Sequence, residues 1–186
     1  MISTNDMRPG QAIDFEGRIC IITDYDRVKP GKGPTFVRAK LKDVMTGQVL
    51  DKTWRGEQKV ELIILDARPH QFMYRQGGTF HFMDLKSYEQ IELNEKQVPE
   101  DISRFLRENM EVQITFHKET PVKVEIPAFV ELKVTSTAPG LRGDTVSGAS
   151  KPATLESGTT IQVPLFINEG DVLKVDTRTG TYVTRA

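Results

Sequence analysis

Short runs of β-branched and aromatic residues, separated by turn-forming residues, recur along the first third of the chain. Three such runs cover residues 19–24, 35–41 and 48–54. A Pro-Gly-Lys-Gly-Pro loop at residues 30–34 separates the first two, and Thr46-Gly47 separates the last two. Strand-like runs joined by such turns are typical of consecutive hairpins. The pattern therefore predicts a small β-barrel in this part of the chain.

The middle third contains another hairpin pattern. Aromatic residues at alternate positions within residues 72–82 flank a turn formed by Gly77 and Gly78. This alternation places one set of side chains on a single face of a strand pair. We expect that set to pack into the core; its members are Phe72, Tyr74, Phe80 and Phe82.

One helix is predicted, over residues 99–110. Apolar residues recur there at helical spacing, at Ile102, Phe105, Leu106 and Met110. The residues before them, Pro99, Glu100 and Asp101, suit a helix start, where a missing N–H costs little and negative charge is favourable.

Strand patterns return in the last third, at residues 160–167, 172–176 and 181–184, with turns at 168–171 and 178–180. A mainly β chain of three small modules in series fits the whole pattern. We expect domains at residues 1–64, 65–128 and 129–186. Because β-rich modules of about 60 residues fold alone only marginally, the hydrophobic core should be divided among them.

Composition narrows the class of protein. Hydrophobic residues make up 38% and charged residues 27% of the chain, which is typical of a soluble globular protein. No apolar run reaches about 18 residues, and no signal sequence or lipidation motif is present. We expect a cytoplasmic chain without a membrane partner. Cys20 lies within a strand-like run, which favours a core position over a reactive thiol.

Charge is distributed unevenly along the chain. The formal net charge is −1, yet residues 27–42 contain six cations and no acid, namely Arg27, Lys29, Lys32, Arg38, Lys40 and Lys42. A local cationic patch can guide phosphate binding while the rest of the surface stays neutral or acidic. A solvated hairpin face is the alternative interpretation, and it stays open.

No pattern indicates an enzyme. The histidines, His70, His81 and His117, lack the spacing of a local metal site. Gly31-Lys32-Gly33 lacks the preceding glycine and the following Ser or Thr of a phosphate-binding loop. Acidic residues are spread out, and nothing pairs an acid with a base. We expect no catalytic residue, no metal and no cofactor.

The loop at residues 30–34 is the most distinctive local feature. Pro30 and Pro34 restrict φ, and Gly31 and Gly33 permit tight bending and leave no bulky neighbour beside Lys32. A loop with few accessible conformations limits the conformational entropy that is lost when the long Lys32 side chain is held against a binding partner. An ordinary hairpin turn with a solvated lysine is the alternative.

Two separated motifs make the chain similar to the bacterial elongation factor P family. The first is the loop at residues 30–34 with the strand pattern at 35–41. The second lies in the last third and comprises Lys151, Pro152, Ala153, Gly158, Ile161, Val163, Pro164, Ile167 and Gly170. The resemblance extends over essentially the whole chain.

This resemblance implies an architecture. It implies a KOW- or SH3-like N-terminal barrel followed by two oligonucleotide-binding (OB) fold barrels, with one short helix in the middle module. The outline would be L-shaped and similar to tRNA, and we expect a monomer. It further implies a factor that docks on the ribosome beside the peptidyl-tRNA, touches ribosomal RNA and relieves stalling at consecutive prolines.

The resemblance also implies roles for particular residues. Lys32 would reach toward the CCA end of the peptidyl-tRNA, while Pro30, Gly31, Gly33 and Pro34 shape its loop. The cationic patch of Lys29, Arg38, Lys40 and Lys42 would contact RNA. In the third module, Gly143, Asp144 and Thr145 match a loop that faces the small subunit, although a plain turn is an equal alternative. Tyr182 and Arg185 match C-terminal positions that face RNA or the small subunit; Tyr182 could instead pack locally within its strand.

In much of the family the tip residue is extended by a modifying enzyme, which would then be a further partner. Proline at position 34 is typical of a subset in which the lysine acts unmodified, and we favour that state here. Two alternative functions stay open. One is an elongation-factor-P-like paralogue, and the other is a general single-stranded RNA-binding OB-fold protein, which would need aromatic platforms among basic residues.

Overall fold

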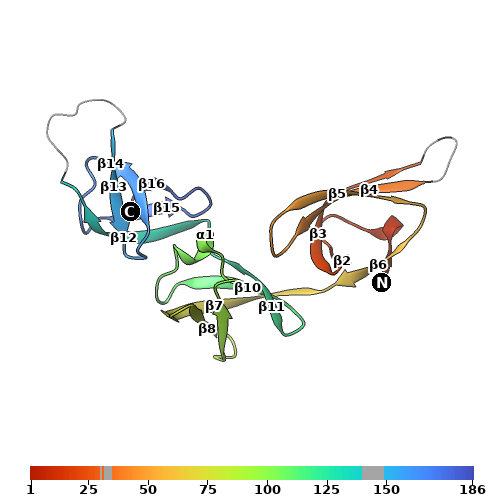
Figure 1. Ribbon diagram of the computed structural model, residues 1–186, viewed down its shortest axis with the longest axis horizontal. Helices are drawn as coiled ribbons and strands as arrows, with labels where there is room; N and C mark the ends of the chain where they lie inside the picture. Colours follow the sequence, from red (N-terminus) through yellow and green to blue (C-terminus); the bar gives the residue numbers. More distant parts are fainter. Residues whose placement is uncertain (30, 32–34, 140–148) are drawn as a thin grey trace. The chain divides into compact units, whose positions relative to one another are not determined.

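The computed structural model describes residues 1–29, 31, 35–139 and 149–186, and its regular structure is almost entirely β (Figure 1). The strands form three sheets that curl into barrels. The expected fold class, mainly β with small barrels in series, is confirmed. The L-shaped outline stays a prediction.

The first sheet forms the N-terminal barrel, in the order β1-β6-β2-β3-β4-β5. Its strands are β1 (Ile2–Ser3), β2 (Ala12–Phe15), β3 (Arg18–Val28), β4 (Phe36–Asp43), β5 (Val49–Arg55) and β6 (Lys59–Ile63), with a 3-10 turn at Thr4–Asp6. The core packs Ile13, Cys20, Ile22, Leu41 and Trp54 together. Cys20 is buried as predicted, and this burial raises the pKa of its thiol, so the thiolate is disfavoured.

The second sheet has the order β11-β10-β7-β8-β9. Its strands are β7 (Leu65–Gln76), β8 (Thr79–Asp84), β9 (Gln90–Asn94), β10 (Glu111–His117) and β11 (Thr120–Glu125). β7 and β8 form the predicted hairpin, and Gly77 in its turn has φ of 58°, a left-handed conformation that favours glycine.

Three of the four aromatic residues predicted for this core are buried, but Tyr74 is not. Phe72, Phe80 and Phe82 are buried, whereas Tyr74 is 43% exposed. The register of β7 against β8 shifts between Phe72 and Tyr74. A bulge of this kind places an extra residue in one strand and re-aims the side chains that follow. The expectation that Tyr74 packs in the core is therefore wrong.

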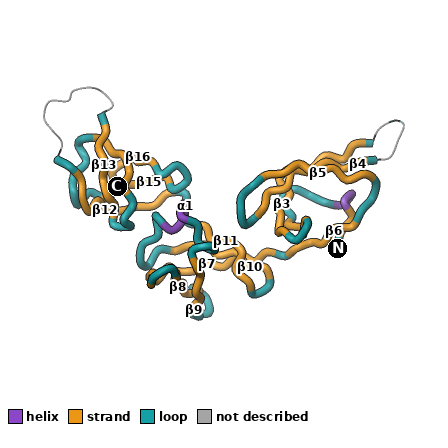
Figure 2. The backbone as a smooth tube through the Cα atoms, in the orientation of Figure 1, coloured by secondary structure: helices purple, strands orange, loops and turns teal. Residues whose placement is uncertain are grey.

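The predicted helix is real but much shorter than expected. α1 covers only Glu100–Ser103, and loop follows it (Figure 2). At the far end of the predicted helix, Asn109 N donates to Phe72 O at 2.8 Å and Phe72 N donates to Met110 O at 2.8 Å, so residues 109–110 pair with β7. Pairing with β7 thus replaces helical hydrogen bonding, while Phe105, Leu106 and Met110 are still buried.

The third sheet has the order β14-β13-β12-β15-β16. Its strands are β12 (Phe129–Thr137), β13 (Ser150–Leu155), β14 (Thr160–Pro164), β15 (Val172–Asp176) and β16 (Thr181–Arg185). Much of the second sequence motif builds this barrel, because Ala153, Ile161, Val163 and Ile167 are all buried. Lys151 is also buried, and its Nζ donates to Ala138 O at 2.5 Å. These residues of the motif therefore serve the fold.

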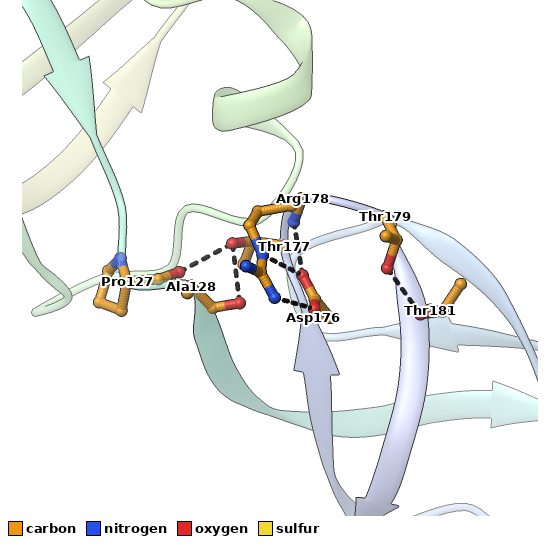
Figure 3. A network of polar contacts seen from close by, with 7 residues as sticks. All are labelled: Pro127, Ala128, Asp176, Thr177, Arg178, Thr179 and Thr181. Atoms are coloured by element: carbon orange, nitrogen blue, oxygen red, sulfur yellow. Dashed lines mark hydrogen bonds and ion pairs between the residues drawn. The ribbon is translucent and has the colours of Figure 1, made fainter. Parts of the chain in front are cut away.

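The chain divides into two compact units. The first contains residues 1–67 and 115–123, and the second contains residues 68–114 and 124–186. Within the second unit, the turn after β15 holds the segment that leads into β12 (Figure 3). Thr177 Oγ1 donates to Pro127 O at 2.8 Å and to Ala128 O at 3.1 Å, and Thr177 N donates to Ala128 O at 2.9 Å. These bonds restrain the entry to the third sheet.

An ion pair completes this turn. Arg178 donates to the Asp176 carboxylate from Nη2 at 2.6 Å and from Nε at 3.1 Å, and its backbone N–H also donates to it at 2.9 Å (Figure 3). The Arg178 side chain is the main cause that lowers the pKa of Asp176 from 3.8 to about 2. A carboxyl group whose pKa is lowered by folding stabilises the fold above its unfolded pKa and loses that contribution as the pH falls through its folded pKa.

We therefore expect the Asp176 carboxyl to titrate near pH 2 in the folded protein. NMR spectroscopy at a series of pH values measures this titration. The Asp176→Asn variant should be less stable than the parent at pH 7 in urea unfolding, and the difference should shrink between about pH 4 and pH 2. Arg178→Gln should move the midpoint of Asp176 upward. A midpoint that does not respond to loss of Arg178 would contradict this cause.

Candidate nucleic-acid interface

β3 and β4 form a hairpin (Figure 1), and the predicted functional loop lies between these two strands in the sequence. The strands pair from Cys20 opposite Asp43 to Val28 opposite Phe36, so the connection begins at Lys29. Gly31 in that connection is exposed, and a Cβ at its position would meet nothing within 4 Å. Lys32, Pro30, Gly33 and Pro34 lie outside the described residues, so their roles stay predictions.

The outer half of β3 is tied back to the barrel. Tyr25 Oη donates to Asn5 O at 3.0 Å and to Thr4 O at 3.3 Å. The register of β3 against β4 shifts between Ile22 and Asp24, so Thr23 has no directly opposite residue on β4. The Thr23 side chain bonds to β4 instead, because its Oγ1 donates to Lys40 O at 3.2 Å. The Tyr25 bonds join the hairpin to residues 4–5, and the Thr23 bond joins β3 to β4, so the hairpin is a braced pair of strands.

The predicted cations of β4 lie on one face of the hairpin. Side chains alternate along a strand, and Val37, Ala39 and Leu41 take the core side of β4. Arg38, Lys40 and Lys42 therefore share the exposed face. Lys29 is also exposed, one residue beyond β3. The structure thus brings three of the four patch residues together on one strand.

Acidic residues on the neighbouring strands were missed by the sequence analysis. Asp26 on β3 lies opposite Arg38, and Lys40 lies between Asp24 on β3 and Asp51 on β5. Opposite charges at facing positions attract and lower the local positive potential. Pairing the predicted strands with each other could have revealed these aspartates. They lie outside residues 27–42 in the sequence, but strand pairing brings them beside the cations of that segment.

Two members of the patch differ in their surroundings. The Arg38 guanidinium lies over the Phe36 ring, 5.2 Å from its centroid, which holds the side chain along the strand. Lys42 pairs with Ile21 and Val49 rather than with carboxylates. Lys42 therefore offers a less compensated charge than Lys40.

The C-terminal candidate residues lie at the end of the third sheet. Tyr182 is half-buried and lines an open groove of about 630 Å³ beside Pro164 and Phe166, and Arg185 is exposed at the end of β16. Phe166 is 60% exposed and was not predicted as a site residue. β14 ends at Pro164, two residues before Phe166, which leaves that ring outside the barrel. Gly143, Asp144 and Thr145 lie outside the described residues.

The histidines occupy separate places. His70 Nε2 lies 3.8 Å from Asp84 Oδ2, His81 Nδ1 lies 3.7 Å from Glu92 Oε1, and His117 Nδ1 lies 3.3 Å from Ile64 O. Across the described part of the chain, no group of three or more His, Cys, Asp or Glu side chains is arranged to hold a metal. No helix among those residues is long and apolar enough to span a membrane.

Comparison with known proteins assigns the family. Residues 3–60 match the model described as "Elongation factor P (EF-P) KOW-like domain", residues 65–124 match "Elongation factor P (EF-P) OB domain", and residues 130–185 match "Elongation factor P, C-terminal". The chain belongs to the elongation factor P family. Elongation factor P of Symbiobacterium thermophilum is 50% identical over 186 residues, and that of Thermoanaerobacter sp. (strain X514) is 49% identical over 185 residues; each comparison covers 100% of both chains.

Solved structures of another translation factor are also similar. Initiation factor 5A from Methanococcus jannaschii superposes with a TM-score of 0.51 at 27% identity, covering 66% of this chain and 94% of that chain. An initiation factor 5A family protein from Naegleria fowleri gives a TM-score of 0.55 at 14% identity, covering 67% of this chain and 96% of that chain, which shows a shared fold alone. The relatives are named as translation factors, and membership of the elongation factor P family supports the role of a translation elongation factor for this chain.

Proposed function

We propose that this chain binds the ribosome beside the peptidyl-tRNA and stimulates peptide-bond formation at consecutive prolines. The observation that supports the proposal is the braced hairpin of β3 and β4, whose strands are joined in the sequence by the Pro-Gly-Lys-Gly-Pro segment, in a chain that matches elongation factor P over its whole length. In this proposal Lys32 contacts the CCA end and holds it in place.

Positioning alone can explain the rate gain. Proline reacts poorly because its secondary amine sits in a ring that restricts its geometry. Holding the reacting groups in a near-attack arrangement removes an entropic part of the barrier, which in well-oriented systems is worth several kcal/mol, on the order of 7 to 11. The factor needs no catalytic group of its own, and no cofactor.

The exposed face of β4 would contribute phosphate contacts. Arg38, Lys40 and Lys42 lie in a row on that face, with Lys29 near the loop. Asp24, Asp26 and Asp51 beside them limit the attraction for phosphate in general. Contacts formed in this way orient the hairpin on RNA more than they increase non-specific affinity.

The remaining parts complete the proposal. We propose domains at residues 1–64, 65–128 and 129–186, acting as a monomer in the cytoplasm. Tyr182 and Arg185 would face RNA or the small subunit, and the loop of Gly143, Asp144 and Thr145 would face the small subunit. The open groove beside Tyr182 and the exposed ring of Phe166 support a contact at that end of the third sheet.

The test is a reconstituted translation reaction. Addition of the purified full-length chain should accelerate synthesis of a Pro-Pro-Pro reporter and leave a reporter with alanines at those positions unchanged. Equal effects on both reporters, or no effect on either, would refute the proposed function.

A further prediction concerns Pro34 and the modification of Lys32. Protein made in a host without modifying enzymes should have the mass of its sequence, apart from loss of Met1, and should already be active. Pro34→Ala should then lower activity about twofold to fivefold, because a freed loop must be ordered on the ribosome at a cost of about 0.4 to 1 kcal/mol. A mass increase on Lys32 in native protein, with activity that depends on it, would contradict the unmodified state.

A further inference from the structure

A pocket of about 420 Å³ lies in the second unit. Its wall is formed by β7 and β8, by the segment after α1 and by the turn after β13. We call it the Tyr74 pocket. The residues that matter here are Tyr74, Ser103, Arg107, Glu108, Glu156 and Ser157.

Tyr74 offers a flat aromatic surface at this pocket. Its ring stacks on His81, with centroids 4.3 Å apart and planes inclined by 19°. His81 covers one face of the ring, yet Tyr74 is 43% exposed, so ring surface is left for a second planar group. Stacking on an exposed aromatic side chain is how many proteins hold unpaired bases.

The position of Tyr74 in the sheet agrees with this chemistry. Tyr74 on β7 lies opposite His81 on β8, which in turn lies opposite Glu92 on β9. OB folds bind oligonucleotides on the face of their second and third strands, which are β8 and β9 here, and Tyr74 lies on the first strand, β7, directly beside β8.

The polar groups of the pocket suit the rest of a nucleotide. Ser157 Oγ is shielded from solvent and has no hydrogen-bond partner among the described residues. A shielded hydroxyl without a partner is uncommon, and a ligand can hydrogen-bond to it only after the atoms that cover it move aside. Arg107 supplies a guanidinium group, which matches phosphate oxygens in charge and geometry.

The carboxylates of the pocket indicate which bases fit. Glu108 and Glu156 line it, and an ionised carboxylate can only accept hydrogen bonds. Cytosine and adenine carry an exocyclic amino group that donates to such an acceptor, whereas uracil presents carbonyl oxygens at the equivalent positions. The carboxylates also repel phosphate, which restricts phosphate to the side of Arg107.

We propose that the Tyr74 pocket binds one unpaired RNA nucleotide, with its base stacked on Tyr74 and its phosphate on Arg107. Bases with an exocyclic amino group are preferred over uracil. The site is separate from the proposed role of Lys32, and it gives the second unit an RNA contact of its own.

The experiment measures binding of fluorescein-labelled oligocytidine and oligouridine hexamers to the full-length chain by fluorescence anisotropy. Oligocytidine should bind more tightly than oligouridine. Tyr74→Ala should weaken oligocytidine binding by about fivefold or more, since each stacked base contributes at least about that factor. Tyr74→Phe keeps the ring and should retain the affinity.

Three further variants make the test specific. Tyr88→Ala is the matched control, because Tyr88 is a 71% exposed tyrosine in the same sheet's β8–β9 connection and does not line the pocket. It should bind like the parent, as should Lys32→Ala, which separates this site from the proposed function. Arg107→Gln should lower the dependence of log affinity on log salt by about 0.7, the value for one phosphate on a single strand.

The outcomes are distinct. Loss of binding with Tyr74→Ala but not with Tyr88→Ala, in a variant whose melting temperature is unchanged, supports the proposal. Equal affinities for the parent, Tyr74→Ala and Tyr88→Ala would overturn it, as would failure of oligocytidine to bind at millimolar concentration. Loss of binding with Lys32→Ala but not with Tyr74→Ala would place the RNA contact at the loop and overturn the proposal for this pocket.

Discussion

Replacing Lys32 with alanine should abolish the stimulation of Pro-Pro-Pro synthesis and leave the folded protein as stable as its parent. The reason for the first half is that the proposed function depends on a single cation held at the end of the hairpin. The reason for the second is that exposed side chains away from special features usually change stability by less than about 0.5 kcal/mol. The adjacent Gly31 is exposed and has open space around it, which is consistent with such a position.

Two measurements check this prediction. The rate of Pro-Pro-Pro reporter synthesis tests the function, and thermal melting followed by circular dichroism tests the fold. Lys29→Ala is the matched control, because it removes a neighbouring exposed cation from the same connection and should reduce activity only partly. Full activity of Lys32→Ala would rule out the role proposed for that residue.

Neutralising the cationic patch should weaken ribosome binding strongly and flatten its salt dependence. The variant replaces Lys29, Arg38, Lys40 and Lys42 together with glutamine. Each phosphate contact that is lost should remove about one unit from the slope of log affinity against log salt. Because Lys40 lies between Asp24 and Asp51 whereas Lys42 does not face a carboxylate across β3 or β5, Lys42→Gln alone should cost more affinity than Lys40→Gln alone.

Binding to purified ribosomes across a salt series measures both effects. A control variant with Lys86 and Lys96 replaced by glutamine removes exposed cations from the second unit and should leave the slope unchanged. If the four-residue variant kept the slope of its parent, these cations would face solvent rather than RNA. If Lys40 and Lys42 contributed equally, the aspartates beside β4 would have no effect on binding.

Local sequence patterns were sufficient for much of the fold. The turn residues at Gly77-Gly78 and the alternating aromatics around them correctly predicted the β7–β8 hairpin, and β15 was predicted with its observed ends, Val172–Asp176. The core position of Cys20 followed from the strand-like run around it. These features depend on the conformational preferences of neighbouring residues and on the two-residue period of a strand. Both properties can be read from a few consecutive residues of the sequence.

Contacts between distant residues decided the remainder. The apolar spacing in residues 99–110 fits a helix, but the helix ends after Ser103, and residues 109–110 pair with Phe72 of β7 instead. The bulge in β7 exposes Tyr74 although the alternation places it with the core aromatics. In each case a hydrogen-bonded partner from another part of the chain outweighs a local preference.

The candidate interface shows the same division. By itself the sequence determined the cations of β4, their alternation with core residues, and the motifs that indicate the family. Only the tertiary structure placed Asp24, Asp26 and Asp51 beside those cations, and only it brought Tyr74, Arg107 and Ser157 around one pocket. The physical reason is that electrostatic potential and pocket shape depend on strand register and on packing, which bring together residues that are far apart in the chain.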